Sequence, residues 1–133
     1  MKFLTGFVTV ILLCGCGARS SDETQVRELI DAVEVAAEGR DTGNVLEHIA
    51  SDYSDAQGFD RAQLQNFLRV WFLANPTVEL LVRIDTLEFP VEGLGRARIH
   101  LNALPSGDSA TLDVEFRRED GDWRVARADR VRE

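Results

Sequence analysis

Cysteine is nearly absent from this sequence, and none occurs beyond residue 16. Cys14 and Cys16 are the only two cysteines among the 133 residues. If residues 1–15 are removed as a leader peptide and the Cys16 thiol is covalently modified, no free thiol remains for a disulfide, for thiol catalysis or for a cysteine metal site. Lysine is scarcer still, because Lys2 is the only one and every other cation is an arginine.

Positive charge is also in deficit. The formal net charge is −8 at pH 7, and removal of Lys2 with a leader would make it −9. Such an acidic surface argues against a nucleic-acid partner and against electrostatic adhesion to anionic lipid. The two histidines, His48 and His100, lie in no recognisable metal or triad motif and are expected on the surface. The sequence therefore predicts no metal and no cofactor.

The sequence also lacks a hydrophobic run long enough to span a bilayer. After Lys2 the uncharged stretch Phe3–Leu13 has the length of a secretory signal peptide, whereas a membrane span needs roughly 20 apolar residues. The segment Leu13-Cys14-Gly15-Cys16 resembles the lipobox of bacterial lipoproteins. This resemblance implies a diacylglycerol thioether on Cys16 and cleavage between Gly15 and Cys16. Plain secretion, a retained anchor and a buried helix are the alternatives.

The lipobox resemblance also implies a domain organisation and a location. Residues 1–15 would be the signal peptide, residues 16–22 the lipidated cysteine with a short polar tether, and residues 23–133 one domain. Two or more acyl chains, at ~0.8 kcal/mol per buried methylene, would hold the protein stably on its membrane. Gly17 stands where an Asp would signal inner-membrane retention, so a Gram-negative source implies the outer membrane, facing the periplasm.

The first half of the domain has the apolar spacing of three amphipathic helices. The first is predicted from Asp22 to Glu38 and the second from Asp41 to near Asp52. The third is predicted over Arg61–Ala74, with Asp60 as its N-cap. Because its middle is apolar nearly all round, this third helix is expected to be largely buried or to contact a partner.

From residue 78 onward the apolar period changes from 3.6 to two. Turn segments at 92–95, 105–108 and 119–122 separate four such stretches, which predicts an antiparallel meander. One face of this sheet should be buried against the core (the dry face) and the other exposed to solvent (the wet face). Every residue assigned to the dry face is apolar: Val78, Leu80, Val82, Ile84, Ala97, Ile99, Leu101, Ala103, Ala110, Leu112, Val114, Phe116, Trp123 and Val125.

Three helices followed by four strands resemble the nuclear transport factor 2-like superfamily. The residues that sharpen the resemblance are Asp52-Tyr53, Gly58-Phe59-Asp60-Arg61 and the closing Gly121-Asp122-Trp123-Arg124-Val125, which is similar to the ending of SnoaL-like members. The resemblance implies an α+β fold in which a curved antiparallel sheet, of four strands with room for a fifth or sixth, wraps three N-terminal helices into a cone. A cystatin-type arrangement fits less well, because it has only one helix.

Enzymes of this superfamily, such as ketosteroid isomerases and scytalone dehydratases, place Asp, His or Tyr on the inner wall of the cone, where burial shifts their pKa values. Here the titratable strand residues fall on the wet face, so we expect no catalytic residue and a non-catalytic binding or interaction domain. The alternative is a SnoaL-like isomerase, cyclase or dehydratase acting on a small apolar substrate through Asp52, Tyr53, Asp55 or His48. The cluster Asp52–Asp55 is otherwise a turn that ends a helix.

Any cavity left in the cone is expected to be a small apolar pocket. Such a pocket suits a small apolar ligand, and an envelope protein is an equally compatible partner. Opposite charges on the wet face would form cross-strand pairs that keep it soluble, and they leave a homodimer open. The predicted lining is aromatic: Tyr53, Phe67, Trp71, Phe116 and Trp123.

Overall fold

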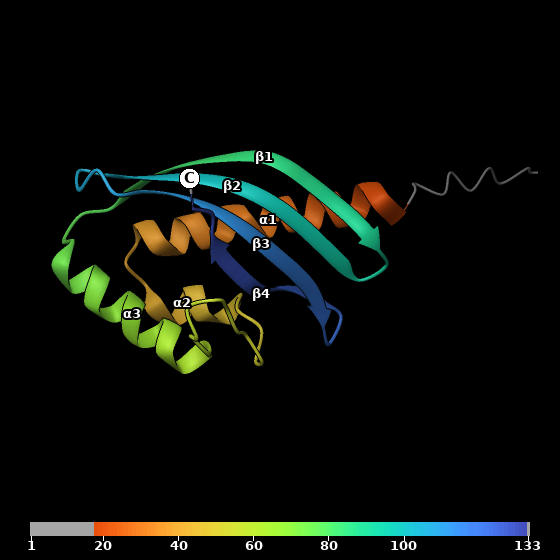
Figure 1. The fold of residues 1–133 in the computed structure, drawn as a ribbon, viewed down its shortest axis with the longest axis horizontal. Helices are drawn as coiled ribbons and strands as arrows, with labels where there is room; N and C mark the ends of the chain where they lie inside the picture. The colour runs from red at the N-terminus through yellow and green to blue at the C-terminus, as the bar shows by residue number, and fades with distance from the viewer. Residues whose placement is uncertain (1–17, 133) are drawn as a thin grey trace, which may run out of the picture.

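Three helices precede four strands in the computed structural model, which describes residues 18–132 (Figure 1). Cys16, Gly15 and the rest of the predicted leader lie outside the described residues. The strands form one antiparallel sheet in the order β1-β2-β3-β4, which curves around α1 (Figure 1). The expected α+β class and four-stranded meander are confirmed. The elements are α1 (Ala18–Glu38), α2 (Thr42–Glu47), α3 (Arg61–Ala74), β1 (Glu79–Val91), β2 (Leu94–Leu104), β3 (Ser109–Glu119) and β4 (Asp122–Arg130).

Helix α1 begins at Ala18, four residues before its predicted start, and ends at Glu38 as predicted. Asp22 therefore lies inside the helix, where its carboxylate pairs with Arg118 on β3. The part of the predicted tether from residue 18 onward is helical. Because a helix rises 1.5 Å per residue against about 3.5 Å for an extended chain, this part spans less distance than an extended tether would.

Helix α3 has the predicted bounds and the predicted cap. The Asp60 carboxylate accepts from the Gln63 N–H at 2.8 Å, and the Gln63 side chain accepts from the Asp60 N–H at 2.9 Å, which makes a capping box. The predicted burial of this helix is wrong. Phe72 is its buried residue, whereas Phe67 is 50% exposed and Leu73 is 79% exposed. Contact of α3 with a partner stays a prediction.

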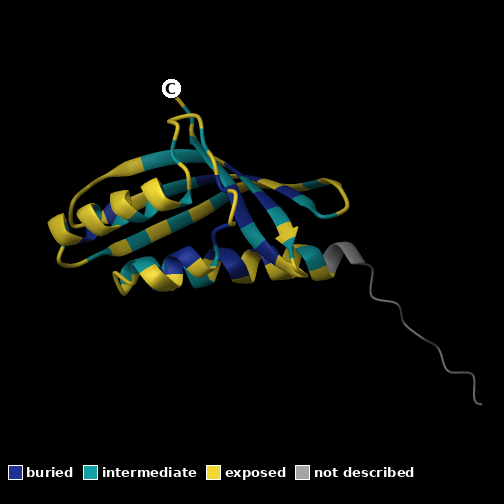
Figure 2. Cartoon of the chain, turned by 90° about the horizontal axis from the view of Figure 1, so that it is seen from below, coloured by how far each residue is buried: buried dark blue, intermediate teal, exposed yellow. Residues whose placement is uncertain are grey.

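The core lies between the concave face of the sheet and the helices α1 and α2 (Figure 2). None of the fourteen residues predicted on the dry face is exposed, and Phe116 is 1% exposed. Helix α1 contributes Val26, Leu29 and Ile30 to the same cluster. Burial of a large apolar side chain is worth about 1.5–3 kcal/mol, so this cluster is the main stabilising feature of the fold.

The turn between β3 and β4 uses two residues with positive φ, Asp120 at 52° and Gly121 at 86°. This is the backbone of a two-residue hairpin whose twist matches that of the flanking strands. At the other side of β4, Ala50 N–H donates to the Val125 carbonyl and Val125 N–H donates to the His48 carbonyl, each at 2.8 Å. In place of the fifth or sixth strand, the described residues have two isolated bridges, Ile49–Val125 and Ser54–Asp60.

Strand β1 contains a bulge, at which the apolar alternation of the sequence shifts its phase by one residue. Ile84 pairs with Ile99 and Thr86 pairs with Arg98, so Asp85 is an extra residue with no partner in the register. Both Asp85 and Thr86 are exposed. A bulge of this kind re-aims the side chain that it carries. It places the Asp85 carboxylate over the neighbouring strand β2.

Candidate functional site

Tyr53 and Asp55, two of the residues considered for acid–base chemistry, contact each other. The Tyr53 side chain is 3% exposed, and its hydroxyl donates to Asp55 Oδ2 at 2.8 Å. Burial, followed by the hydrogen bond to Asp55, raises the pKa of the Tyr53 phenol well above its usual value. Asp55 Oδ1 also accepts from the backbone N–H groups of Gln57 and Phe59, at 2.9 and 3.1 Å. The Asp55 carboxylate therefore organises a loop, as the turn interpretation predicts.

Asp52 and His48 point to other partners. The Asp52 carboxylate is exposed and accepts from the Arg117 guanidinium at 2.8 Å, and this hydrogen bond lowers the pKa of Asp52. His48 is the C-cap of α2 and lies beside a shallow hollow between α1 and α2. Of the four residues of the enzymatic alternative, the structure brings together only Tyr53 and Asp55.

Four of the five aromatic residues expected to line a cavity belong to one core cluster or pack against it, and the fifth does not. Tyr53, Phe116 and Trp123 belong to the packed core, and Phe67 is on the exposed side of α3. Trp71 is half-buried, and its Nε1 donates to Asp108 Oδ2 at 3.3 Å. Two hollows among the described residues are lined by other side chains. An apolar pocket lined by the five aromatic residues stays a prediction.

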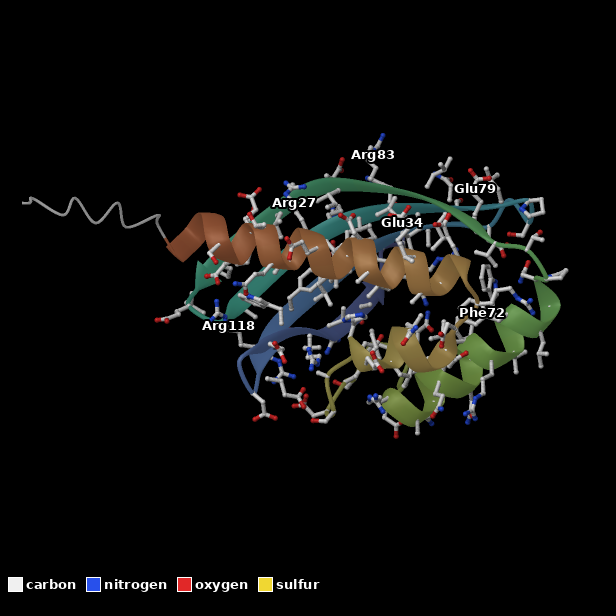
Figure 3. All side chains as sticks on the ribbon, turned by 180° about the vertical axis from the view of Figure 1, so that it is seen from behind. Arg27, Glu34, Phe72, Glu79, Arg83 and Arg118 are labelled. Carbon is white, nitrogen blue, oxygen red and sulfur yellow. The ribbon has the colours of Figure 1, made fainter. Side chains whose placement is uncertain are left out.

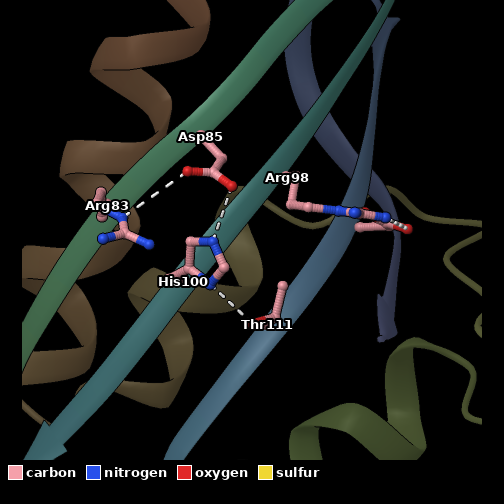
Figure 4. A network of polar contacts seen from close by, with 6 residues as sticks. Arg83, Asp85, Arg98, His100 and Thr111 are labelled. Carbon is pink, nitrogen blue, oxygen red and sulfur yellow. Dashed lines mark hydrogen bonds and ion pairs between the residues drawn. The ribbon is translucent and has the colours of Figure 1, made fainter. Parts of the chain in front are cut away.

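A chain of polar contacts crosses three strands on the outer face of the sheet (Figure 4). His100 Nε2 lies 3.0 Å from Asp85 Oδ2, and His100 Nδ1 lies 2.7 Å from Thr111 Oγ1. Arg83 Nε lies 3.9 Å from Asp85 Oδ1, which is a loose ion pair. The hydrogen bond from His100 is the main cause that lowers the pKa of Asp85, so this carboxylate is ionised at neutral pH. The His100 ring is thus held at both nitrogens.

The local fold explains why these side chains meet. His100 and Thr111 are directly opposite each other in the β2–β3 register, so their side chains share one face. Asp85 reaches them because the bulge in β1 turns it over β2. His100 was expected on the surface, and neither of its partners was predicted. The pairing with Thr111 follows from the hairpin register, and the three-residue step from Ile84 to Leu87 is the signal in the apolar pattern that could have indicated the bulge.

A hollow of about 670 Å³ lies beside this chain of contacts. It is bounded on one side by the C-terminal segment, which leaves β4 on the side of the sheet away from α1 (Figure 2). Arg83 projects outward from β1 (Figure 3). The lining residues are Leu81, Val82, Arg83, His100, Leu101, Asn102, Ser109, Ala110, Thr111, Arg130, Val131 and Arg132.

The contacts Asp85–His100–Thr111 have the order of groups found in a hydrolytic triad. Thr111, however, lies inside a strand whose backbone is paired with β2. An acyl-transfer site needs N–H donors aimed at the developing oxyanion, and ladder N–H groups are already committed to their neighbours. Within residues 18–132 no group of three or more His, Asp or Glu side chains is arranged to hold a metal ion.

No protein-family model and no curated protein matches this sequence. Solved structures do match it. A domain of unknown function with a cystatin-like fold from Nostoc punctiforme aligns with a TM-score of 0.71 at 12% identity, over 86% of this chain and 78% of that one. A nuclear transport factor 2-like protein of unknown function from Pseudomonas putida aligns with a TM-score of 0.67 at 19% identity, over 84% and 86%. The fold is nuclear transport factor 2-like.

A third solved structure also matches this chain. A putative calcium/calmodulin-dependent protein kinase type II association domain from Thiobacillus denitrificans aligns with a TM-score of 0.66 at 17% identity, over 80% of this chain and 94% of that one. At such identities the likeness establishes the nuclear transport factor 2-like fold alone. Function therefore has to be argued from the residues of this chain.

Proposed function

We propose that this chain is an exported lipoprotein, anchored to a membrane by lipid on Cys16, whose nuclear transport factor 2-like domain is a non-catalytic binding module. The sequence Leu13-Cys14-Gly15-Cys16 supports the anchor. No helix within residues 18–132 is both long and apolar enough to cross a membrane. Because α1 begins at Ala18, the domain would be held close to the lipid surface.

The orientation of α1 supports a defined end of the domain near the membrane. The carboxylate of Asp22 pairs with Arg118, so the start of α1 packs beside the end of β3 (Figure 3). Helix α3 lies at the opposite end of the molecule (Figure 1). In a Gram-negative source we place this protein on the outer membrane, facing the periplasm, because Gly17 follows the cysteine.

The composition of the concave face is the observation that favours binding over catalysis. The inward side chains predicted for the sheet are all apolar, and none of them is exposed. The superfamily's enzymes need an acid or base inside the cone, with a pKa tuned by burial. In this chain Asp52 is paired with Arg117 outside the core, and Asp55 is used in a loop.

The Tyr53–Asp55 contact is the observation that favours the second candidate, a SnoaL-like isomerase, cyclase or dehydratase. A buried phenol hydrogen-bonded to a carboxylate is a group that such enzymes use. Its raised pKa keeps the Tyr53 phenol protonated at neutral pH, so it could only act as a proton donor. Turnover of a small apolar substrate that is lost in Tyr53→Phe would establish this candidate over the first.

Native mass spectrometry of the full chain, extracted from its own membrane, tests the lipoprotein proposal. We expect a mature form that begins at Cys16 and carries the added mass of two or three acyl chains. Cys16→Ser should lose the lipid and the membrane attachment, whereas Cys14→Ser removes the neighbouring thiol and should keep both. A Cys16→Ser protein that is still processed and membrane-bound would contradict the proposal.

A further inference from the structure

We propose that the outer-face hollow beside His100 binds a small organic molecule through a phosphate or sulfate group. This inference rests on the proposal that the domain is a binding module, and it names the ligand class and the site. The hollow is separate from the cone, since it lies on the other face of the sheet. Its residues come from β1, β2, β3, the end of β4 and the C-terminal segment 131–132.

The charge of the lining is the first argument. The chain carries 23 acidic residues against 15 basic ones, so most of its surface repels anions. The hollow is an exception, because Arg83, Arg130 and Arg132 line it together with His100, and within residues 18–132 no Asp or Glu lines it. One carboxylate, that of Asp85, contacts two of these residues, His100 at 3.0 Å and Arg83 at 3.9 Å. An anion would therefore find the hollow far more favourable than its surroundings.

The hydrogen-bond donors are the second argument. Arg83 is a long, exposed side chain held only by its loose contact with Asp85, so its guanidinium can turn toward a ligand. Arg130 donates through one nitrogen to the Ser109 carbonyl at 2.9 Å, and its other N–H groups remain available for a ligand. Guanidinium groups bind tetrahedral oxyanions through paired N–H donors. Two guanidinium groups and a hydroxyl suit the oxygens of one phosphate or sulfate.

The contact between His100 and Thr111 links anion binding to a proton. The ionised Asp85 carboxylate only accepts, so His100 Nε2 donates to it, and in the neutral ring Nδ1 accepts the Thr111 hydroxyl proton. When the ring gains a second proton, Nδ1 donates to Thr111 Oγ1. The Thr111 hydroxyl is then free to donate to the anion. Binding should therefore take up a proton and strengthen as the pH falls.

Other charged groups surround this ring. The groups that face His100 are Asp85 and Arg83 from β1, Arg98 from β2, Asp113 from β3, Arg130 from the end of β4, and Arg132 just beyond it.

The size and the apolar wall of the hollow point to an ester and not to a free inorganic ion. Its volume of about 670 Å³ falls in the range of small-molecule sites, roughly 300–1,000 Å³, and far exceeds what a lone phosphate fills. Leu81 and Val131 are apolar members of the lining, and Leu81 is exposed. They would contact the organic part of the ligand.

Isothermal titration calorimetry of the full chain in detergent tests this proposal with two probes, sodium sulfate and phenyl phosphate, against sodium chloride at equal ionic strength. Sulfate keeps its charge between pH 5.5 and 8, so any pH dependence of its binding belongs to the protein. We expect saturable binding of both probes, with phenyl phosphate tighter. Sulfate should bind about tenfold more tightly at pH 5.5 than at pH 8.

Variants assign the binding to the hollow. Arg83→Gln and Arg130→Gln should each weaken sulfate binding about tenfold. Thr111→Val keeps a β-branched side chain and should abolish the pH dependence. Arg96→Gln removes the same charge from an exposed position of β2 outside the hollow and should leave binding unchanged. Arg130 also donates to the Ser109 carbonyl, so Arg130→Gln could fail to fold for a structural reason. In that case Arg83→Gln alone tests whether the anion binds in the hollow.

Three results would overturn the proposal: no saturable binding of either probe, equal weakening by Arg83→Gln and Arg96→Gln, or phenyl phosphate binding no more tightly than sulfate. The lipid on Cys16 is weighed in a separate experiment and does not touch the hollow. If the protein is lipidated but binds no anion, only the proposal of the ligand is refuted. If it binds anions but carries no lipid, only the proposal of the lipid anchor is refuted.

Discussion

The guanidinium carbon of Arg118 lies 5.2 Å from the centroid of the Trp123 ring, and the same guanidinium pairs with Asp22. Arg118 thereby joins the start of α1 to the end of β3 and covers a buried indole. The contact over the ring is worth about 0.5–1 kcal/mol, and the partly buried ion pair contributes in addition. We expect Arg118→Ala to lower the free energy of unfolding in urea by about 1–2 kcal/mol.

Arg27 offers a matched control for Arg118. It pairs with Glu23 one helical turn away at 3.0 Å, and both side chains are about half exposed. A pair of this kind contributes about 0.3–0.5 kcal/mol, so Arg27→Ala should have a much smaller effect. Equal losses in the two variants would show that the position of Arg118 over Trp123 adds nothing.

Removal of the N-cap of α3 should destabilise the folded protein. Asp60→Ala leaves the Gln63 N–H without its acceptor and breaks the capping box, which should reduce the free energy of unfolding by about 1 kcal/mol. Asp60→Ser keeps an acceptor at the same position and should recover most of the loss. Urea unfolding followed by circular dichroism measures both variants. If Ser is no better than Ala, the hydrogen bond of the cap is not the source of the stability.

Truncation of two adjacent residues of α3 should change the free energy of unfolding by very different amounts. Phe72 is buried, so Phe72→Ala should lower the free energy of unfolding by about 3–5 kcal/mol. Leu73 is largely exposed, so Leu73→Ala should change it by less than about 0.5 kcal/mol. Chemical unfolding of the two variants side by side gives the comparison. A large loss in Leu73→Ala would mean that a partner or a second copy covers this side of α3.

Tyr53 should make stability depend on alkaline pH. The pKa of its phenol is raised in the folded protein, so the stabilisation it provides is complete below the unfolded pKa near 10. This stabilisation is lost as the pH rises through the higher folded pKa. We expect the free energy of unfolding to fall above about pH 10, and to fall less in Tyr53→Phe.

The same residue can be titrated directly, because Tyr53 is the only tyrosine in the chain. Tyrosinate absorbance at high pH therefore reports this one phenol. It should appear at a higher pH in the folded protein than in the protein unfolded in urea, and Tyr53→Phe removes the signal. Coincident titrations of the folded and unfolded chain would contradict the burial of the hydroxyl.

Much of the fold could be predicted from the sequence because local rules determined it. The alternation along residues 78–125 assigned the dry face correctly, since a strand presents successive side chains to opposite faces. Asp60 marked the start of α3 correctly, since capping acts within one turn. Gly121 indicated its hairpin, because its turn needs a positive φ.

Other features depended on contacts that no local pattern encodes. Helix α3 looked buried because its middle is apolar, yet only one side of it meets the rest of the chain. The start of α1 moved to Ala18, where Asp22 can reach Arg118 across 96 positions of sequence. Ion pairs and packing at such separation depend on how the elements are placed in space, and the periodicity within one element cannot report that placement.

The sequence alone determined the chemistry expected at Cys16, the acidic balance of the chain and the apolar character of the concave face, because each of these is a property of residue types and their spacing. Only the tertiary structure decided that Asp85, His100 and Thr111 meet. That meeting requires one extra residue in β1 and the pairing of His100 with Thr111, and the end of β4 brings Arg130 to the same hollow. The sheet register and its bulge arise from the packing of the whole domain, and so the outer-face hollow became visible only with the fold.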